Sequence, residues 1–173
     1  GAENYRRSGE VDPMRVPKDG FFAHQVMWDG WVDIENYRTH IVGHWNYDAS
    51  ITKDVYVVSS GEKVELFINN KSKGFGEREY NFLFTFKDIK WEPGVIRAVS
   101  YDANNKEVSS AEIRTTSEPA KLKLSMMQSP DGFKADGADL VLVQVEVVDA
   151  QGNRCPLSNE MIEFELTGPA EWR

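Results

Sequence analysis

The chain of 173 residues contains a single cysteine, Cys155, and no long apolar run. One cysteine excludes an intrachain disulfide, so the folded state must be stabilised by burial of apolar side chains. Without an apolar stretch of about eighteen residues, neither a membrane-spanning helix nor a membrane partner is expected. Cys155 stands beside Pro156, with no histidine or second cysteine nearby in sequence, which favours a partly buried small side chain over a reactive thiol.

Positive charge is also scarce. The chain has 20 Lys and Arg residues against 28 Asp and Glu, which gives a formal net charge of -8. Because an acidic surface repels phosphate backbones, nucleic acid is not expected as a partner. A hydrophobic content of 40%, with 12% aromatic residues, is sufficient for a packed core and argues against a disordered chain.

Helical periodicity is confined to a segment near the N-terminus. Pro17 suits a first helical position, and apolar residues recur every three to four positions from Val16 to about Trp31. The pattern predicts one helix in this segment. Its expected apolar face comprises Phe21, Phe22, Val26 and Trp28.

Beyond residue 36 the period changes to two, with turn residues between short runs. Val64, Leu66 and Ile68 fall on one face of such a run, and Asn69-Asn70 then offers the positive φ angles of a tight hairpin. Regularly spaced short strands are typical of a β-sandwich, close to the seven strands of a small Ig-like domain. The expected strands are 39–42, 54–58, 63–68, 82–86, 95–101 and 107–115.

The polar, proline-bearing segment 116–119 is interpreted as a domain boundary. After it, alternation predicts strands near 122–126, 140–148 and 162–166. Since an Ig-like sandwich needs roughly 100 residues, the module at 117–173 is expected to be incomplete. The predicted fold class is therefore all-β, with a helical segment at 1–35, an Ig-like sandwich at 36–116 and a second, truncated sandwich at 117–173.

No catalytic centre is predicted. Paired carboxylates could perform acid–base chemistry if they faced each other in a cleft, but Glu163 and Glu165 alternate with apolar residues and are expected to face water. Asp136 and Asp139 flank Gly137, which favours a turn-forming role. The sequence has no Gly-rich phosphate loop, cysteine pair or Gly-x-Ser-x-Gly elbow, so no cofactor is expected.

His40, His44 and Asp48 are candidate metal ligands. Their spacing of four would place all three on one face of a helix. The residues between them do not have a helical pattern, and in a strand this spacing shares a face without converging on a point. We therefore expect no metal site.

Aromatic side chains are candidates for a carbohydrate site, because exposed Trp and Tyr can stack on the apolar faces of pyranose rings. Packing inside a sandwich or at a domain interface is the commoner role. Trp45 and Tyr47 are the best candidates for exposure, since they share one face of an extended segment at a domain entry. The candidate aromatic residues are Trp28, Trp31, Trp45, Tyr47, Trp91 and Trp172.

Five motifs follow one another along the chain. They are VDPMRVPK at 11–18, HIVGHWNY at 40–47, VELFINNKSKG at 64–74, WEPG at 91–94 followed by RAVSYD at 97–102, and ADGADL at 135–140. In this order they resemble the C-terminal part of bacterial family 2 glycoside hydrolases of β-galactosidase type. The resemblance implies the end of a catalytic (β/α)8 barrel, then an Ig-like domain, then a second, invasin-like Ig module.

The resemblance also implies that the catalytic residues lie outside this chain. In this family both catalytic Glu residues lie on barrel strands upstream of Gly1, and no position here matches either motif. The chain is thus expected to be a non-catalytic region that supports the barrel of the same polypeptide, within a parent enzyme that hydrolyses O-glycosyl bonds. The alternatives are a carbohydrate-binding module that uses Trp45 and Tyr47, with a glycan as its partner, and a free-standing interaction module.

Two further expectations follow from the resemblance. The family is commonly exported, which implies a periplasmic or extracellular location. Without the barrel, the apolar face of the helix and an open strand edge of the second module would be uncovered, so self-association of the chain is expected.

Overall fold

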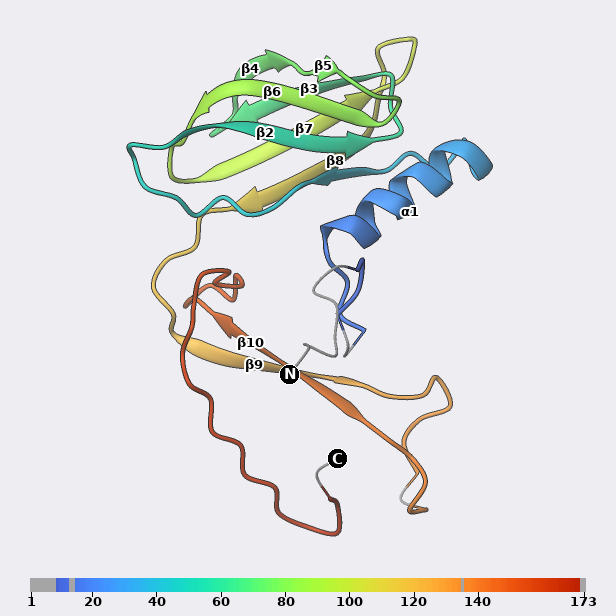
Figure 1. The fold of residues 1–173 in the computed structure, drawn as a ribbon, viewed down its shortest axis with the longest axis vertical. Helices are drawn as coiled ribbons and strands as arrows, with labels where there is room; N and C mark the ends of the chain where they lie inside the picture. Colours follow the sequence, from blue (N-terminus) through green and yellow to red (C-terminus); the bar gives the residue numbers. More distant parts are fainter. Residues whose placement is uncertain (1–8, 13–14, 135, 172–173) are drawn as a thin grey trace, which may run out of the picture. The chain divides into compact units, whose positions relative to one another are not determined.

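The computed structural model describes residues 9–12, 15–134 and 136–171. The motifs at 11–18 and 135–140 therefore lie partly outside the described residues, and Trp172 lies outside them entirely. The chain divides into two compact units, residues 1–115 and 116–173. The first unit contains the helix α1 and strands β1 to β8, and the second contains β9 and β10 (Figure 1).

The predicted helix is present as α1, Asp19–Val32. Lys18 occupies the N-cap position, so the prediction that Pro17 takes the first helical position is wrong. Pro17 instead forms an antiparallel bridge with Val11, ahead of the helix. Asp19 stands in the first turn, where its negative charge complements the positive end of the helix dipole.

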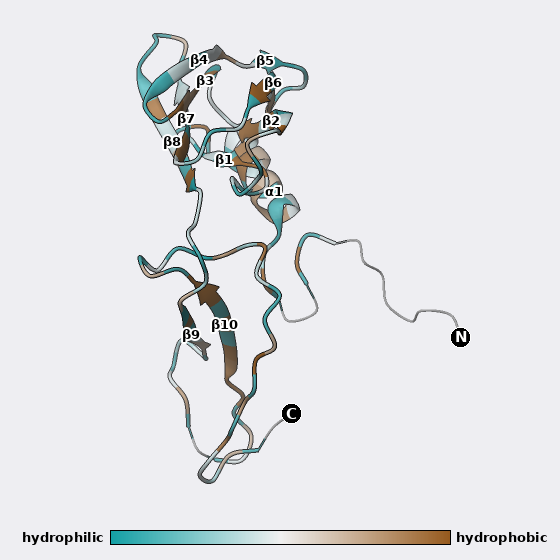
Figure 2. Ribbon diagram, turned by 90° about the vertical axis from the view of Figure 1, so that its left-hand side faces the viewer, coloured by the Kyte–Doolittle hydropathy of each residue, from teal (hydrophilic) through white to brown (hydrophobic). Residues whose placement is uncertain are grey.

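The first unit is a sandwich of two four-stranded antiparallel sheets, as predicted. One sheet has the order β1-β2-β6-β5 and the other β4-β3-β7-β8. In Figure 2, hydrophobic segments of this unit fall on β2, β6 and β7. The strands are β1 (Thr39–Ile41), β2 (Thr52–Ser59), β3 (Lys63–Ile68), β4 (Lys71–Phe75), β5 (Glu77–Arg78), β6 (Leu83–Lys90), β7 (Val95–Tyr101) and β8 (Glu107–Arg114).

The turn chemistry read from the sequence is confirmed. Asn69 and Asn70 have φ angles of 49° and 63°, which connect β3 to β4 in a two-residue hairpin. Gly94, with φ of 129°, completes the turn between β6 and β7. The first unit has eight strands in its described residues where six were expected, because β4 and the two-residue β5 do not alternate in hydrophobicity and are formed through pairing with β3 and β6.

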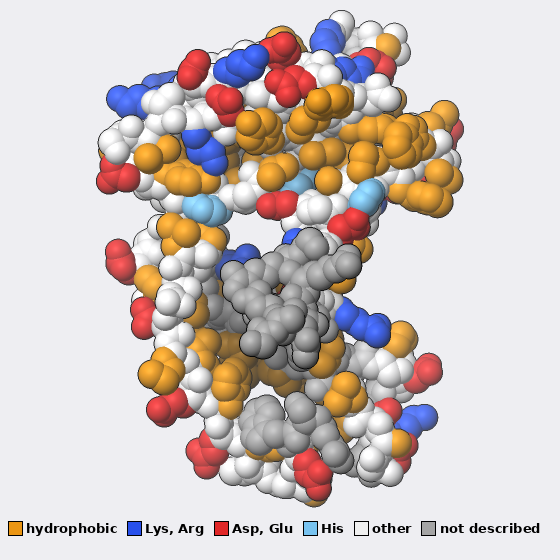
Figure 3. Space-filling view, in the orientation of Figure 1, with side chains coloured by type: hydrophobic (Ala, Val, Ile, Leu, Met, Phe, Trp, Pro, Cys, Tyr) orange, Lys and Arg blue, Asp and Glu red, His pale blue; other side chains and the backbone are white. Residues whose placement is uncertain are grey.

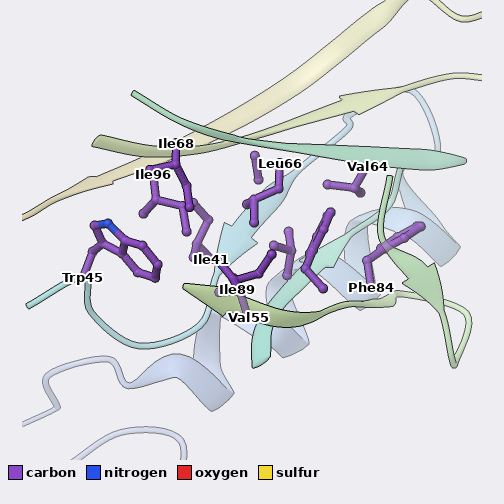
Figure 4. Packing of buried hydrophobic residues seen from close by; sticks show 12 residues of the cluster. Ile41, Trp45, Val55, Val64, Leu66, Ile68, Phe84, Ile89 and Ile96 are labelled. Atoms are coloured by element: carbon purple, nitrogen blue, oxygen red, sulfur yellow. The ribbon is translucent and has the colours of Figure 1, made fainter. Parts of the chain in front are cut away.

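The core lies between the two sheets, where side chains from both inner faces interdigitate (Figure 4). Alternation along β3 buries Val64, Leu66 and Ile68. The remaining buried members of this cluster are Ile41, Trp45, Val55, Val57, Phe84, Phe86, Ile89, Ile96 and Ala98.

Helix α1 packs on the sandwich through its inner side. Val26 is fully buried, and Gly30 lies so close to the residue after β2 and the residue before β6 that an added Cβ would overlap the Phe82 ring and approach the Cβ of Ser60 to 3.1 Å. Asp29 forms an ion pair with Arg38, directly before β1. Arg38 is also held by backbone bonds to Ser60, whose N–H donates to the Arg38 carbonyl at 3.1 Å.

The second unit contains the hairpin of β9 (Lys121–Met127) and β10 (Leu142–Val148). The expected strand at 162–166 is wrong, since these described residues form no strand. Alternation is necessary for a half-buried strand, but a strand forms only where a partner completes its hydrogen bonds. Cys155 is buried, with Sγ 3.7 Å from the Ser117 carbonyl oxygen, in agreement with the predicted packing role.

Within the described ranges, no helix combines the length and apolar character that crossing a membrane requires.

The close approach at Gly30 yields a stability prediction. Replacing Gly30 by Leu overpacks the contact with Phe82, and we expect a loss of about 1–3 kcal/mol in the free energy of unfolding of the first unit. The matched control is Gly20→Leu, because Gly20 lies on the exposed side of the same helix and its nearest neighbour is the flexible Glu10 side chain. Thermal unfolding of both variants checks this, and equal midpoints would contradict the packing of α1.

Candidate functional site

Trp45 is buried, which corrects the expectation of an exposed stacking residue. Only 2% of its surface is accessible, and it belongs to the core cluster between the sheets. Its indole Nε1 donates a hydrogen bond to the Glu92 carbonyl at 2.9 Å. A sugar ring therefore has no access to either face of this indole, and Trp45 cannot be a stacking platform in this fold.

The backbone of Trp45 is tied to the same region. Its carbonyl oxygen accepts hydrogen bonds from Trp91 Nε1 at 3.2 Å and from Thr115 Oγ1 at 2.7 Å. Thr115 Oγ1 in turn accepts from the Gly94 N–H at 3.1 Å. These bonds join the β1–β2 connection, the β6–β7 turn and the end of β8. We refer to Trp45, Trp91, Glu92, Gly94 and Thr115 as the Trp45 junction.

Tyr47 lies beside Trp45, with ring centroids 6.2 Å apart, so the structure brings the two predicted residues together. The Tyr47 ring is stacked on His44 at 4.5 Å, and Lys53 Nζ donates to its hydroxyl at 2.7 Å. Partial burial and the nearby Lys53 lower the pKa of His44. The half-buried Tyr47 ring is thus already in contact with protein groups.

The three residues weighed for a metal have separate partners. His40 Nε2 lies 2.8 Å from Asp19 Oδ1, and its ring is stacked on Phe22 at 4.8 Å. His44 Nδ1 accepts the Asn46 N–H, and Asp48 Oδ1 accepts the Ser50 N–H, which lowers the Asp48 pKa. Within the part of the chain that the structure describes, no group of three or more His, Cys, Asp or Glu residues could hold a metal ion.

The carboxylates weighed for catalysis lie at the surface. Glu163 and Glu165 are exposed, in a segment without regular structure rather than on the expected strand. Asp136 Oδ1 accepts the N–H of Ala138 at 2.9 Å, and Asp139 Oδ2 accepts the Lys134 N–H at 2.7 Å. Asp136 and Asp139 therefore have the turn-forming roles expected from their flanking of Gly137.

Sequence reasoning missed one buried carboxylate in the second unit. Asp149, expected as part of a turn, is 1% exposed and accepts hydrogen bonds from the N–H groups of Ser117, Gln151 and Asn153. Desolvation raises the pKa of this carboxyl, but the bonds from Asn153 and the backbone outweigh it, and the net shift is downward. Asp149 joins the interdomain segment to the loop after β10, which is a structural role.

The exposed apolar residues of α1 lie opposite its buried face. Phe21, Trp28 and Val32 are seven and four residues apart and share one side, and Trp28 and Trp31 are 64% and 65% exposed. The helical pattern of the sequence predicts Val26 on the same apolar face as Phe21 and Trp28. This prediction is wrong, because Val26 is buried on the opposite side of the helix, against the sandwich. Figure 3 shows hydrophobic side chains gathered over this part of the first unit. We refer to Phe21, Trp28 and Val32 as the outer α1 face; the Trp31 ring lies at its border, 5.3 Å from the Phe82 ring.

Two family patterns match the chain. One, described as a domain of unknown function (DUF4982), matches residues 51–109, and the other, glycoside hydrolase family 2 C-terminal domain 5, matches residues 122–173. The first match covers most of the sandwich.

Curated relatives and solved structures agree with these matches. A β-glucuronidase of Formosa agariphila is 44% identical over 97% of this chain, and a β-galactosidase of Bacteroides ovatus is 32% identical over 92%. The chain spans 17% and 18% of the lengths of these two relatives. A solved family 2 β-glucuronidase has a TM-score of 0.80 and 42% identity, covering 87% of this chain and 15% of that one. A family 2 member from Bacteroides cellulosilyticus has a TM-score of 0.73 and 25% identity, covering 86% and 22%.

The position of Trp45 predicts the effect of removing it. Trp45→Ala leaves a cavity and leaves the Glu92 carbonyl without its indole donor, and we expect a loss of about 3–5 kcal/mol in the free energy of unfolding. Tyr80→Ala is the control, because Tyr80 is 73% exposed on the same unit. Urea unfolding followed by circular dichroism measures both. A Trp45→Ala midpoint close to that of the control would show that the indole is not part of the core.

Asp149 predicts an acid-sensitive second unit. A carboxyl whose folded pKa lies below its unfolded value of about 3.9 stabilises the fold above that pH, and this contribution is lost as the pH falls through the folded pKa. We expect Asp149→Asn to be less stable at pH 7 and to lose less stability than wild type on acidification. The exposed Asp131→Asn is the control. Amide signals of β9 and β10, followed in urea at several pH values, test this; parallel pH profiles for wild type and Asp149→Asn would contradict it.

Proposed function

Since this chain belongs to the C-terminal region of the family 2 glycoside hydrolases, we propose that it is a non-catalytic support module of a longer enzyme that hydrolyses O-glycosyl bonds. Its partner is the catalytic barrel of the same polypeptide. The proposal is supported by the position of the matches, which fall on a sandwich and a second β unit, and by the small share of each relative that the chain spans.

The observation that carries the proposal is the two-sided character of α1. A helix with apolar residues on opposite sides is suited to burial between two layers. The inner side, with Val26 and Gly30, packs on the sandwich, whereas Trp28 and Val32 on the other side are largely exposed. We propose that the barrel covers the outer α1 face, and that α1 is the last helix of that barrel.

The substrate of the parent enzyme is proposed as a β-linked pyranoside. The relative from Formosa agariphila is named a β-glucuronidase and the one from Bacteroides ovatus a β-galactosidase, so both glycosides are candidates. The higher identity to the β-glucuronidase favours a glucuronide over the galactoside first expected. A periplasmic or extracellular location remains a prediction.

Substitutions on the outer α1 face should have different effects in the parent enzyme, where the barrel covers this face, and in the isolated chain, where it is exposed. The double substitution Trp28→Ser and Val32→Ser removes apolar area that the barrel buries. In the parent enzyme we therefore expect the free energy of unfolding to fall by about 3 kcal/mol or more. In the isolated chain the same pair should change the unfolding midpoint little, because both side chains are already exposed. Calorimetry of both proteins measures this, with Tyr80→Ser as the control.

A small and equal effect in both proteins would overturn the docking of α1. The isolated chain is also expected to self-associate through this face at high concentration, and the Ser pair should reduce that association in light scattering. Nitrophenyl β-glucuronide and β-galactoside should be hydrolysed by the parent enzyme and not by this chain. Turnover by the purified chain would overturn its non-catalytic role.

A further inference from the structure

Phe75 is an exposed aromatic residue on a strand of the sandwich. Phe75 is 60% exposed on β4, the edge strand of the sheet β4-β3-β7-β8. It pairs with Glu65 on β3, and the register between these strands shifts between Glu65 and Phe67. Such irregularities re-aim side chains at the edge of a sheet and are frequent next to functional sites.

The backbone next to Phe75 is closely packed, and two side chains lie near the Phe75 ring. Gly76, the next residue, is packed so closely that an added Cβ would lie 2.8 Å from the Phe86 ring in the core. On the surface, the centroid of the Phe75 ring lies 6.2 Å from the centroid of the Tyr101 ring. Lys63 Nζ lies 5.8 Å from the Phe75 centroid. A pre-positioned ring loses little conformational entropy when a ligand stacks on it.

Hydrogen-bond donors and acceptors both lie beside the Phe75 ring. Glu65 accepts hydrogen bonds from the Tyr101 hydroxyl at 3.2 Å and from Ser72 Oγ at 2.5 Å. Lys63 Nζ contacts Asn105 Oδ1. Burial and the bond to Glu65 raise the pKa of Tyr101, which keeps its hydroxyl protonated. The group therefore offers a carboxylate acceptor, an ammonium donor and a hydroxyl within one surface.

The charges of this surface are balanced. Lys63 and Arg97 offset Glu65 and Glu107, and Arg97 is paired with Glu107 at 2.9 Å. A strongly charged ligand gains no net attraction from such a set. One exposed ring is also far below the roughly 800 Å² per partner of a stable protein interface. An amphipathic, neutral and small ligand fits these properties.

We propose that Phe75, Glu65, Tyr101 and Lys63 form a binding site for a neutral pyranose. The C–H groups of one sugar face contact the Phe75 ring, whose π face is electronegative. The hydroxyls at the sugar edge bind Glu65 and Lys63, which can accept and donate respectively. This site lies on the sheet β4-β3-β7-β8, whereas Trp45 and Tyr47 lie in the connection between β1 and β2, and the site does not depend on how α1 is covered.

Titration of the ¹⁵N-labelled chain with methyl β-D-glucopyranoside and methyl β-D-galactopyranoside tests the site. We expect saturable shifts of amides in β3, β4 and β7 with at least one of the two sugars, and binding at least about tenfold weaker in Phe75→Ala. Tyr80→Ala is the matched control and should bind as wild type. Sodium glucuronate should bind no more tightly than the neutral sugars.

Three results would overturn the proposal. They are the absence of saturable shifts with both sugars, shifts confined to other strands, and equal affinity of Phe75→Ala and wild type. Because Phe75 is exposed, its truncation should leave the unfolding midpoint nearly unchanged, and Glu65→Gln supplies a second variant that should weaken binding while it preserves the shape. In the parent enzyme, protection of β3 and β4 from hydrogen exchange by the rest of the polypeptide would also overturn the site.

Discussion

Burial of Trp45 between the two sheets is the contact on which the first unit depends. The indole fills the end of the core and donates to the Glu92 carbonyl, while the Trp45 carbonyl accepts from Trp91 and Thr115. A buried polar group that loses its partner costs more than the bond itself contributes. The junction therefore fixes three chain segments at once, and it includes residues of two of the sequence motifs, HIVGHWNY at 40–47 and WEPG at 91–94. HWNY and WEPG are signatures of packing.

The packed sandwich fixes the positions of two exposed surfaces, the outer α1 face and the surface around Phe75. The pair of Asp29 and Arg38 and the close contact of Gly30 with Phe82 set α1 against the first sheet. The outer α1 face is then presented as an apolar surface, suited to burial against another protein layer. On the other sheet, Phe75 stands in balanced polar surroundings, which suits a small ligand better than a protein. The same sandwich thus has two surfaces of different character.

The sequence predicted those parts of the fold that are encoded locally. Alternation placed β3 and β7 at their observed bounds, and the Asn69-Asn70 turn followed from tolerance of positive φ. Pairing-dependent features could not be read in this way, so β4 and β5 were missed and 162–166 was wrongly assigned a strand. Trp45 was misplaced because an irregular segment carries no period from which its facing can be read. The burial of Asp149 could not be predicted either, because one of its hydrogen-bond partners, Ser117, is 32 residues away in sequence.

Hydrogen exchange at the Trp45 junction tests most directly that these motifs serve packing. The exchanging groups are the indole N–H groups of Trp45 and Trp91 and the amide of Gly94, all of which donate within the junction. The account predicts that the Trp45 indole N–H exchanges only with global unfolding of the first unit, at the rate of the slowest amides of β3 and β7. Fast exchange of this N–H, while β3 and β7 stay protected, would show that the end of the sandwich is open and would contradict the account.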